Sequence, residues 1–284
     1  MLDPSETPFL SRLAVHQAYN ATHTWLTDVM NATAASGDYI VEGESAVAYA
    51  LSDKTRETNL TVITDRVFGI SGTEEAISHY GLDSQYAFQL EKAMKELKIK
   101  IERNILGATG SSAGGQGYAR SFKGAFYFAI TGGNLASGAA SVSALTESIY
   151  NTLCQDIFTD GGNPDTTLVN GFLKRRISAF ASNNTRNIDM TDNKKLTGVI
   201  SYYESDFGVQ EIVLDRWCKG LSNGETGAGL VLEIDKWAIA YLRKPFTTPL
   251  AIDGDRKRVQ ILAEYTLECL AAKHNGYLSA FATA

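Results

Sequence analysis

Residues 81–107 read GLDSQYAFQLEKAMKELKIKIERNILG, and this stretch decides the fold. Apolar side chains recur in it every three or four residues, which predicts one amphipathic helix. These side chains are Tyr86, Leu90, Ala93, Leu97, Ile101 and Ile105. Asp83 and Ser84 can cap the first turn, and Gly107 suits the left-handed residue that often ends a helix. We therefore expect a helix over residues 84–106.

The face opposite the apolar stripe is charged. Glu91 precedes Lys95, and Glu96 precedes Lys100, by four residues, an order that favours ion pairs along a helix. At 1.5 Å per residue the helix is roughly 35 Å long, about the diameter of a small domain. A single helix of this composition is marginally stable in water, so its apolar stripe must pack against other elements.

The composition is that of an ordinary globular protein. The chain has 284 residues, of which 44% are hydrophobic and 20% are charged, enough for one large or two ordinary domains. Its net charge of −6 argues against a dedicated nucleic-acid binder, which would be basic overall. No apolar run approaches the roughly 18 residues that a membrane span needs, and no secretion signal is recognisable, so we expect no membrane partner.

Neither a metal site nor a cofactor site is expected. The three cysteines are far apart and lack CxxC spacing, which favours reduced, buried thiols in a protein made in a cytoplasm: Cys154, Cys218 and Cys269. The four histidines are isolated from one another and from any acidic pair at metal-ligand spacing: His16, His23, His79 and His274. We interpret them as solvated or structural side chains.

The N-terminal quarter of the chain predicts an arm followed by a hairpin, and the hairpin has too few apolar residues on either face to be a core strand pair. Residues 1–30 begin with an extended, proline-containing segment whose apolar anchors are Phe9 and Leu10. Such an arm becomes ordered only by lying on a body, its own or a neighbour's. Residues 31–70 predict a long polar hairpin with its hydrophilic tip at residues 52–57. An isolated hairpin is marginally stable, so this one should project and rest on a partner.

The rest of the chain predicts an α/β layer. Helices are expected over residues 141–158 and 171–181. Strands are expected over residues 166–170, 197–203, 209–216, 230–242 and 258–270, and a polar surface loop over 182–195. The Asp-Phe-Gly sequence at 206–208 is interpreted as a hairpin turn, because no other kinase motif accompanies it.

Residues 107–117 are rich in glycine and are expected to form a flexible linker. Within them, residues 110–114 (GSSAG) match the GxSxG pattern of serine hydrolases. That motif needs a strand before the serine and a helix after it, whereas here a helix precedes and more glycine follows. A serine hydrolase using Ser112 is therefore a weak alternative.

Two short basic clusters stand out in an acidic chain, at residues 174–176 (KRR) and 256–258 (RKR). Each is interpreted as a solvated face or a set of inter-subunit ion pairs, and the alternative is a weak, salt-sensitive phosphate contact. Because no catalytic constellation is recognisable in so long a chain, we expect the function to reside in its surface and not in enzymatic activity.

Several phrases spread along the chain resemble the major capsid proteins of tailed phages. They are TPFLS at 7–11, VFGISGT at 67–73, QYAFQL at 85–90, DGGNPD at 160–165, SDFG at 205–208 and EYTLE at 264–268 beside HNG at 274–276. The resemblance implies an α+β, HK97-like capsid fold. It implies an N-terminal arm (1–30), an E-loop hairpin (31–70), a P-domain (71–124) with spine helix 84–106, an A-domain (125–250) and a return to the P-domain (251–284).

The resemblance also implies what the protein does. Hexamers and pentamers would close an icosahedral shell around double-stranded DNA, with only weak, non-specific contact between the acidic shell and the genome. Portal, scaffold or decoration proteins are further expected partners, and the virion is the expected location. The residues expected to contact neighbouring subunits are Phe9, Leu10, Asp53, Lys54, Arg56, Glu57, Lys174, Arg175, Arg176, Arg256, Lys257 and Arg258.

Three alternatives remain at this point. An encapsulin-type nanocompartment shell would have the same fold but would enclose a cargo enzyme. A phage tail or adhesion protein would be a binding module, and a serine hydrolase would be an enzyme.

Overall fold

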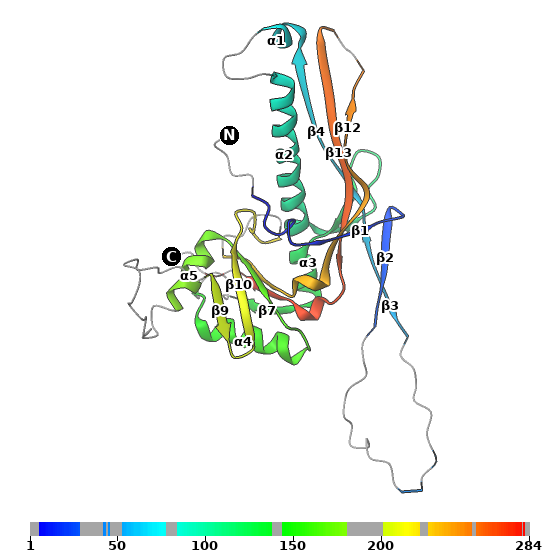
Figure 1. Cartoon of the computed structure of the whole chain (residues 1–284). Helices are drawn as coiled ribbons and strands as arrows, with labels where there is room; N and C mark the ends of the chain where they lie inside the picture. The colour runs from blue at the N-terminus through cyan, green and yellow to red at the C-terminus, as the bar shows by residue number, and fades with distance from the viewer. Residues whose placement is uncertain are drawn as a thin grey trace.

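The computed structural model describes residues 6–28, 42–43, 45, 53–77, 84–137, 144–180, 201–221, 227–251, 254–279 and 281. The expected long helix is present as α2 (Gln85–Gly107), which lies along a four-stranded sheet (Figure 1). Ser84 caps it by accepting a hydrogen bond from the backbone N–H of Ala87. Leu97 and Ile101 are only 2% and 1% exposed, which confirms that the apolar stripe is a core face.

Two details of the predicted helix are wrong. Gly107 does not adopt the left-handed conformation; the cap is Ala108, which is extended because the chain continues directly into strand β5 (Thr109–Ser112). Glu91 and Lys95 form the expected ion pair at 2.5 Å. Glu96 and Lys100 do not pair with each other, because β4 lies beside the helix and supplies other partners, Arg66 for Glu96 and the Asp65 carbonyl for Lys100.

The sheet beside α2 has the order β1-β12-β13-β4. Its strands are β1 (Ala14–Gln17), β4 (Val62–Ser71), β12 (Trp237–Pro249) and β13 (Arg256–Cys269). The strand expected over residues 258–270 is present as β13. Its alternate residues Ile261, Ala263, Tyr265 and Leu267 belong to the core that contains the α2 stripe, and Val259 is also buried. The short helix α1 (Gly72–Ala76) follows β4 at the far end of this sheet (Figure 1).

A two-stranded hairpin leaves the body below this sheet (Figure 1). It consists of β2 (Thr22–Thr27) and β3 (Thr55–Leu60), paired antiparallel with Thr27 opposite Thr55. Its first strand therefore lies in the segment expected to be the arm, and β3 overlaps the expected tip at 52–57. Residues 62–70 of the expected hairpin instead belong to β4, whose Val62 and Ile70 are buried. Most of residues 31–52, including the short strands expected at 39–41 and 47–50, lie outside the described residues.

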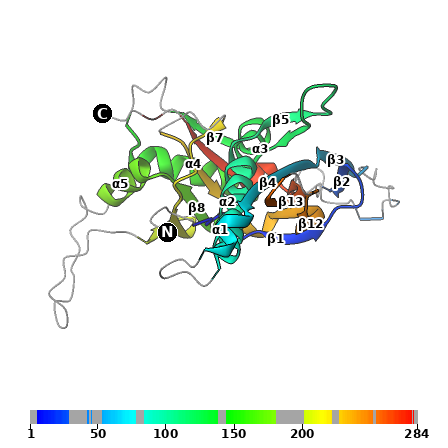
Figure 2. The same ribbon diagram turned by 90° about the horizontal axis from the view of Figure 1, so that it is seen from above.

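The second sheet has six strands in the order β7-β14-β11-β8-β10-β9. They are β7 (Asn134–Ser137), β8 (Thr166–Val169), β9 (Tyr202–Ser205), β10 (Gly208–Leu214), β11 (Gly229–Leu232) and β14 (Gly276–Ser279). Helices α4 (Glu147–Thr159) and α5 (Gly171–Phe180) cover one face, where Val169, Ile212 and Val231 point. The alternate residues Leu168 and Leu230 point into the core shared with α2. Seen from above, α5 and the β2–β3 hairpin lie on opposite sides of α2 (Figure 2).

The chain passes between the two sheets more often than the expected boundaries allow. Strand β12 falls in the expected A-domain range, 125–250, but pairs with β13 in the other sheet. Strand β14 falls in the range expected to return to the P-domain but pairs with β7 and β11. The crossings occur at the 3₁₀ turns Ile234–Lys236 and Ala272–His274. Sheet membership depends on long-range pairing, which a local pattern does not encode.

Residues 107–117 are not a simple linker. They contain β5, which pairs antiparallel with β6 (Ser121–Lys123). Helix α3 (Ala125–Gly132) follows and buries Phe126 and Phe128 in the core that contains the α2 stripe. Aromatic side chains fill this junction, and the Phe128 ring meets the Trp237 ring edge-on at 6.0 Å.

Candidate functional site

The described residues contain no arrangement typical of an enzyme centre. Within them, no group of three or more His, Cys, Asp or Glu side chains is placed to hold a metal ion. Ser112 lies on strand β5 opposite Ser121, so the helix that a nucleophile elbow requires does not follow it. The three cysteines are buried and unpaired, as expected for reduced thiols. No helix in the described part of the chain is long and apolar enough to cross a membrane.

The residues expected to contact neighbouring subunits lie in four separate places. Phe9 and Leu10 are at the centre of the molecule, and residues 53–57 are on the hairpin. Residues 174–176 are on α5, and residues 256–258 are at the far end of β13. They do not form a single site.

Phe9 is placed inside its own subunit. Its side chain is fully buried, and its ring meets the Trp237 ring at 6.1 Å. Its side chain is therefore unavailable to a neighbour, which corrects that expectation. Leu10 is partly buried against the same core. The arm becomes ordered on its own body, the first of the two alternatives considered above.

The basic clusters are partly engaged within the chain. Lys174 donates to the Ile212 carbonyl at 2.9 Å, and the Arg176 guanidinium lies 5.4 Å from the centre of the Phe172 ring. Lys257 pairs with Glu75 of α1 at 2.7 Å. Arg256 and Arg258 line a pocket of about 570 Å³ between β4 and β13, together with Val67, Phe68, Gly69, Ile70, Ser71, Gly254 and Asp255.

On the hairpin, Asp53, Lys54 and Arg56 are exposed and Glu57 is partly buried. Near the hairpin and strand β1, three apolar side chains are also exposed: Val15, Tyr19 and Leu26, at 59%, 86% and 60%. Exposed apolar side chains beside a projecting ribbon are candidates for burial between subunits.

Asn59 anchors the hairpin to the body. Its side-chain amide donates to the carbonyls of Lys123 and Leu267, at 3.0 and 2.8 Å, and its oxygen accepts from the Lys123 N–H at 2.8 Å. The side chain is buried, so these bonds are shielded from water. They join β3 to β6 and β13.

The carboxylate of Glu264 on β13 is held by two arginines. Arg120 Nη2 lies 2.6 Å from one oxygen, and Arg243 Nε lies 2.8 Å from the other. Thr61 Oγ1 also donates to the first oxygen at 3.1 Å. Burial alone would raise the pKa of Glu264, but these hydrogen bonds outweigh it and hold the pKa below its ordinary value.

Two histidines meet at one buried carboxylate. His16 Nδ1 and His23 Nε2 lie 2.9 and 3.2 Å from the same oxygen of Glu268. Burial opposes ionisation of Glu268, yet the histidine contacts hold its pKa below the ordinary value. The expected isolation of the histidines is therefore wrong for this pair, because the fold brings both side chains to Glu268 near the end of β13. His79 lies outside the described residues.

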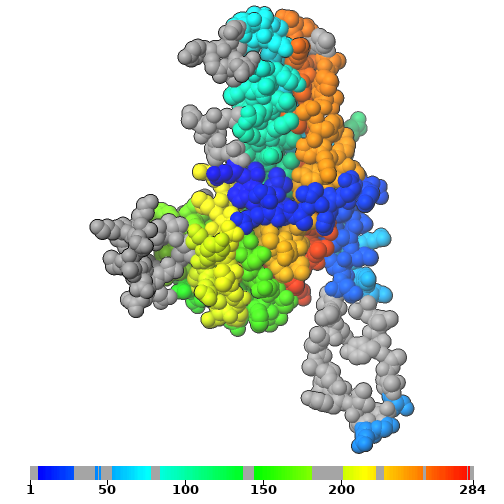
Figure 3. Space-filling model, in the orientation of Figure 1, coloured from blue at the N-terminus to red at the C-terminus, as the bar shows by residue number. Residues whose placement is uncertain are grey.

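The N-terminal arm crosses the junction between α2 and the six-stranded sheet (Figure 3). The backbone N–H groups of Phe9 and Leu10 donate to the two oxygens of Glu102 on α2, at 2.8 and 2.7 Å. Arg12 forms a two-pronged ion pair with Glu211 on β10, at 2.6 and 2.8 Å. The arm thus binds both halves of its own subunit.

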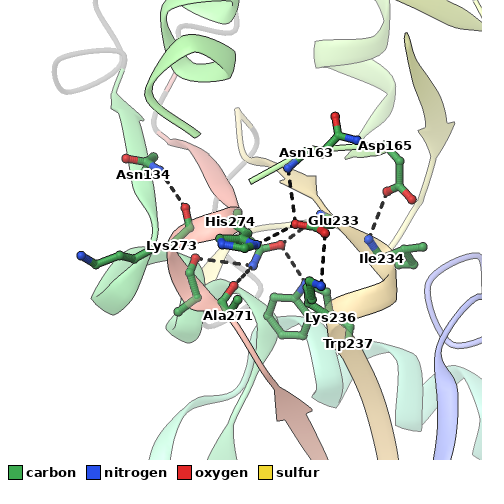
Figure 4. A network of polar contacts seen from close by, with 12 residues as sticks. Asn134, Asn163, Asp165, Glu233, Ile234, Lys236, Trp237, Ala271, Lys273 and His274 are labelled. Atoms are coloured by element: carbon green, nitrogen blue, oxygen red, sulfur yellow. Dashed lines mark hydrogen bonds and ion pairs between the residues drawn. The ribbon is translucent and has the colours of Figure 1, made fainter. Parts of the chain in front are cut away.

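A second polar network joins the halves where the chain crosses between the sheets (Figure 4). The Glu233 carboxylate lies 2.8 Å from His274 Nδ1 and accepts the Asn163 N–H at 3.4 Å. The Asn275 side chain accepts from Trp237 Nε1 at 2.8 Å and donates to the Ala271 carbonyl at 2.6 Å. These bonds join the turn between β11 and β12 to the turn between β13 and β14.

Sequence reasoning missed Glu102, although a signal was present. It lies on α2 next to Ile101 and one turn before Ile105 and Leu106, all of which are buried. A carboxylate inside an apolar stripe indicates a buried partner. That partner, Asp215, follows β10 and had no comparable local signal.

The family model described as SU10 major capsid protein matches residues 1–282. The major capsid protein of Escherichia phage Phieco32 is 22% identical over 315 residues, covering 94% of this chain and 88% of that protein.

Solved structures with the same architecture include both capsids and an encapsulin. The capsid asymmetric unit of cyanophage A-1(L) superposes with a TM-score of 0.69 at 15% identity, covering 97% of this chain and 93% of that one. The structure of Microbacterium phage Oxtober96 gives 0.65 at 12% identity, covering 98% and 93%. The holo-SrpI encapsulin complex of Synechococcus elongatus PCC 7942 gives 0.62 at 13% identity, covering 98% and 89%. At these identities the likenesses establish the fold.

Proposed function

The chain belongs to the SU10 major capsid protein family, and from that we propose that its subunits assemble as hexamers and pentamers into an icosahedral phage head. Membership itself makes the chain a structural protein of the virion capsid and not an enzyme. The α+β, HK97-like fold predicted from the sequence is confirmed. The serine hydrolase alternative is therefore abandoned, and the encapsulin alternative is the weaker one, because that likeness concerns the fold alone.

The family match over residues 1–282 carries this proposal, and the projecting hairpin supports it. Strands β2 and β3 form a two-stranded ribbon of mostly polar residues, which has little stability of its own. In a shell such a ribbon can lie across a neighbouring subunit. The outer face of the four-stranded sheet offers a matching surface, because Ile63, Val67 and Phe246 are exposed there, at 51%, 46% and 41%.

We also propose further partners. Double-stranded DNA should touch the shell only weakly, because a chain of net charge −6 offers few phosphate contacts. Portal, scaffold or decoration proteins would complete the head. Their contacts would use the exposed residues of the hairpin, of α5 and of the far end of β13.

A hairpin variant tests the assembly proposal. Thr27 and Thr55 are directly paired, so replacing residues 28–54 by Asn-Gly should close the ribbon with a two-residue turn. The buried anchor Asn59 is retained. We expect a soluble subunit with an unchanged circular dichroism spectrum and melting temperature, which forms no closed particles in negative-stain electron microscopy.

The matched control replaces residues 29–53 by a glycine-serine linker of equal length. It preserves the reach of the segment but removes its side chains, so it should also fail to close particles. Normal particles from either variant would contradict the inter-subunit role. Unfolding of the Asn-Gly variant would mean that the deleted segment supports its own subunit. Particles recovered from infected cells should contain genomic DNA, whereas an enzyme cargo would favour the encapsulin alternative.

A further inference from the structure

Two acidic side chains meet in the interior where the N-terminal arm crosses the molecule. Glu102 of α2 and Asp215 after β10 are both completely buried, and their carboxyl groups lie close enough for each to affect the pKa of the other. Asp215 Oδ1 accepts the Trp217 N–H at 2.8 Å. The two carboxyl groups come from the two halves of the subunit, and the arm covers them.

One proton is needed to complete this arrangement. Both oxygens of Glu102 accept backbone N–H groups of the arm, whereas Asp215 Oδ2 is buried and has no donor among the described residues. Two carboxylates can only accept hydrogen bonds, so a bond between them requires a proton on one of them. Two adjacent buried carboxyl groups cannot both ionise without strong repulsion, and such a pair shares one proton.

The surroundings do not neutralise the pair in another way. Arg103 is turned onto the Trp217 ring, 5.8 Å from its centre, and Arg12 is paired with Glu211 at the surface. Cys218 is fully buried beside both carboxyl groups, and its thiol pKa is raised by burial and by their charge. Within the described residues, no lysine, arginine or histidine pairs with Glu102 or Asp215.

We propose that the proton shared by Glu102 and Asp215 is a latch that holds the N-terminal arm across the junction, and that loss of this proton releases the arm. With the proton present, Glu102 keeps both backbone hydrogen bonds and the two halves are joined. Without it, two buried negative charges repel each other, and withdrawal of the arm admits water to them. Withdrawal also uncovers the Trp237 ring on which Phe9 packs.

The direction of the pH dependence follows from the two states. Burial, and then the charge of Asp215, raise the pKa of Glu102 from 4.5 to about 8 in the latched state. In the released state Glu102 is hydrated, and its pKa returns to the ordinary value. The latched state therefore binds the proton more tightly. Between pH 4.5 and about pH 8, each pH unit raises the ratio of released to latched chains about tenfold. Above about pH 8 this ratio no longer changes with pH.

Hydrogen–deuterium exchange of residues 6–12 in the full-length, unassembled chain measures this release directly. The amides of Phe9 and Leu10 are the ones that Glu102 protects. After correction for the intrinsic pH dependence of exchange, their opening constant should rise about tenfold per unit from roughly pH 5 to pH 8. An opening constant that does not change with pH would overturn the proposal.

Asp215→Asn is the decisive variant. Its side-chain oxygen can still accept the Trp217 N–H, and its NH₂ group takes the place of Oδ2 and donates permanently to Glu102. We expect the arm to stay protected in alkaline solution and the pH dependence to vanish. A variant that kept the tenfold slope would exclude the shared proton as its cause.

Glu211→Gln is the matched control. It breaks the ion pair with Arg12, which also fastens the arm but is exposed and does not involve the latch. Opening should increase to a similar extent throughout the same pH range, so the slope should remain. Loss of the slope in this control would assign the pH dependence to the surface pair and overturn the latch.

Discussion

Replacing Asn59 by alanine should destabilise the subunit, because this buried side chain anchors the hairpin to the body. The substitution removes three long-range hydrogen bonds, two to Lys123 and one to Leu267. At about 0.5–1.5 kcal/mol for each bond, the loss is roughly 1.5–4.5 kcal/mol. Asn59→Asp should cost more, because a carboxylate would face the carbonyl oxygens of Lys123 and Leu267 where the amide now donates.

Urea unfolding of unassembled subunits, followed by circular dichroism, measures this loss as a lower midpoint at an unchanged slope. Thr58→Ala is the control, since Thr58 is the preceding residue on β3 and is only partly buried. It should change the free energy of unfolding by no more than about 0.5 kcal/mol. Equal midpoints for Asn59→Ala and the unaltered chain would refute the anchoring role. Tolerance of Asn59→Asp would show that the site is open to water.

Leu97→Ala should lower the free energy of unfolding by about 2–5 kcal/mol, because the side chain is only 2% exposed. Met94→Ala on the same helix is the control and should cost far less, because Met94 is 42% exposed. Equal losses of stability in thermal unfolding would show that the stripe is not a core face. Ser112 should not react with a fluorophosphonate probe, because it lies on strand β5 and not in a nucleophile elbow. Stoichiometric labelling that disappears in Ser112→Ala would argue against this. The ionised form of Glu264 is stabilised in the folded state, so its contribution to stability is present above the ordinary carboxyl pKa of 4.5 and is lost as pH falls through the lower folded value. Glu264→Gln should therefore flatten the acid limb of a stability–pH curve, and an unchanged limb would assign acid sensitivity to other groups.

The elements that the sequence predicted best are those defined by local periodicity. The spacing of Leu97, Ile101 and Ile105 predicts α2. It places these side chains on one face of the helix, and that face is buried in the core. The alternation from Val259 to Leu267 predicts β13 equally well. The errors concern partners: Glu96 and Lys100 are correctly placed on the helix surface, yet each finds its partner on β4.

The residues expected to contact neighbouring subunits also show that local features were predicted from the sequence, whereas their partners were not. The sequence indicated that Phe9 anchors the arm, but not that it does so inside its own subunit. The sequence shows the two basic triplets, but it does not show their partners. Lys174 donates to a carbonyl of β10, Arg176 lies over the Phe172 ring and Lys257 pairs with Glu75 of α1. Their role between subunits remains a prediction.

The sequence by itself determined the long helix, strand β13 and, through the resemblance, the capsid fold. Each follows from residues that are close together in the chain, whose side-chain spacing or turn chemistry acts locally. Only the tertiary structure decided that β12 and β14 exchange sheets, that His16 and His23 share Glu268, and that Glu102 meets Asp215. Those contacts join residues up to 252 positions apart, and their stability comes from burial and pairing that exist only once the chain is folded.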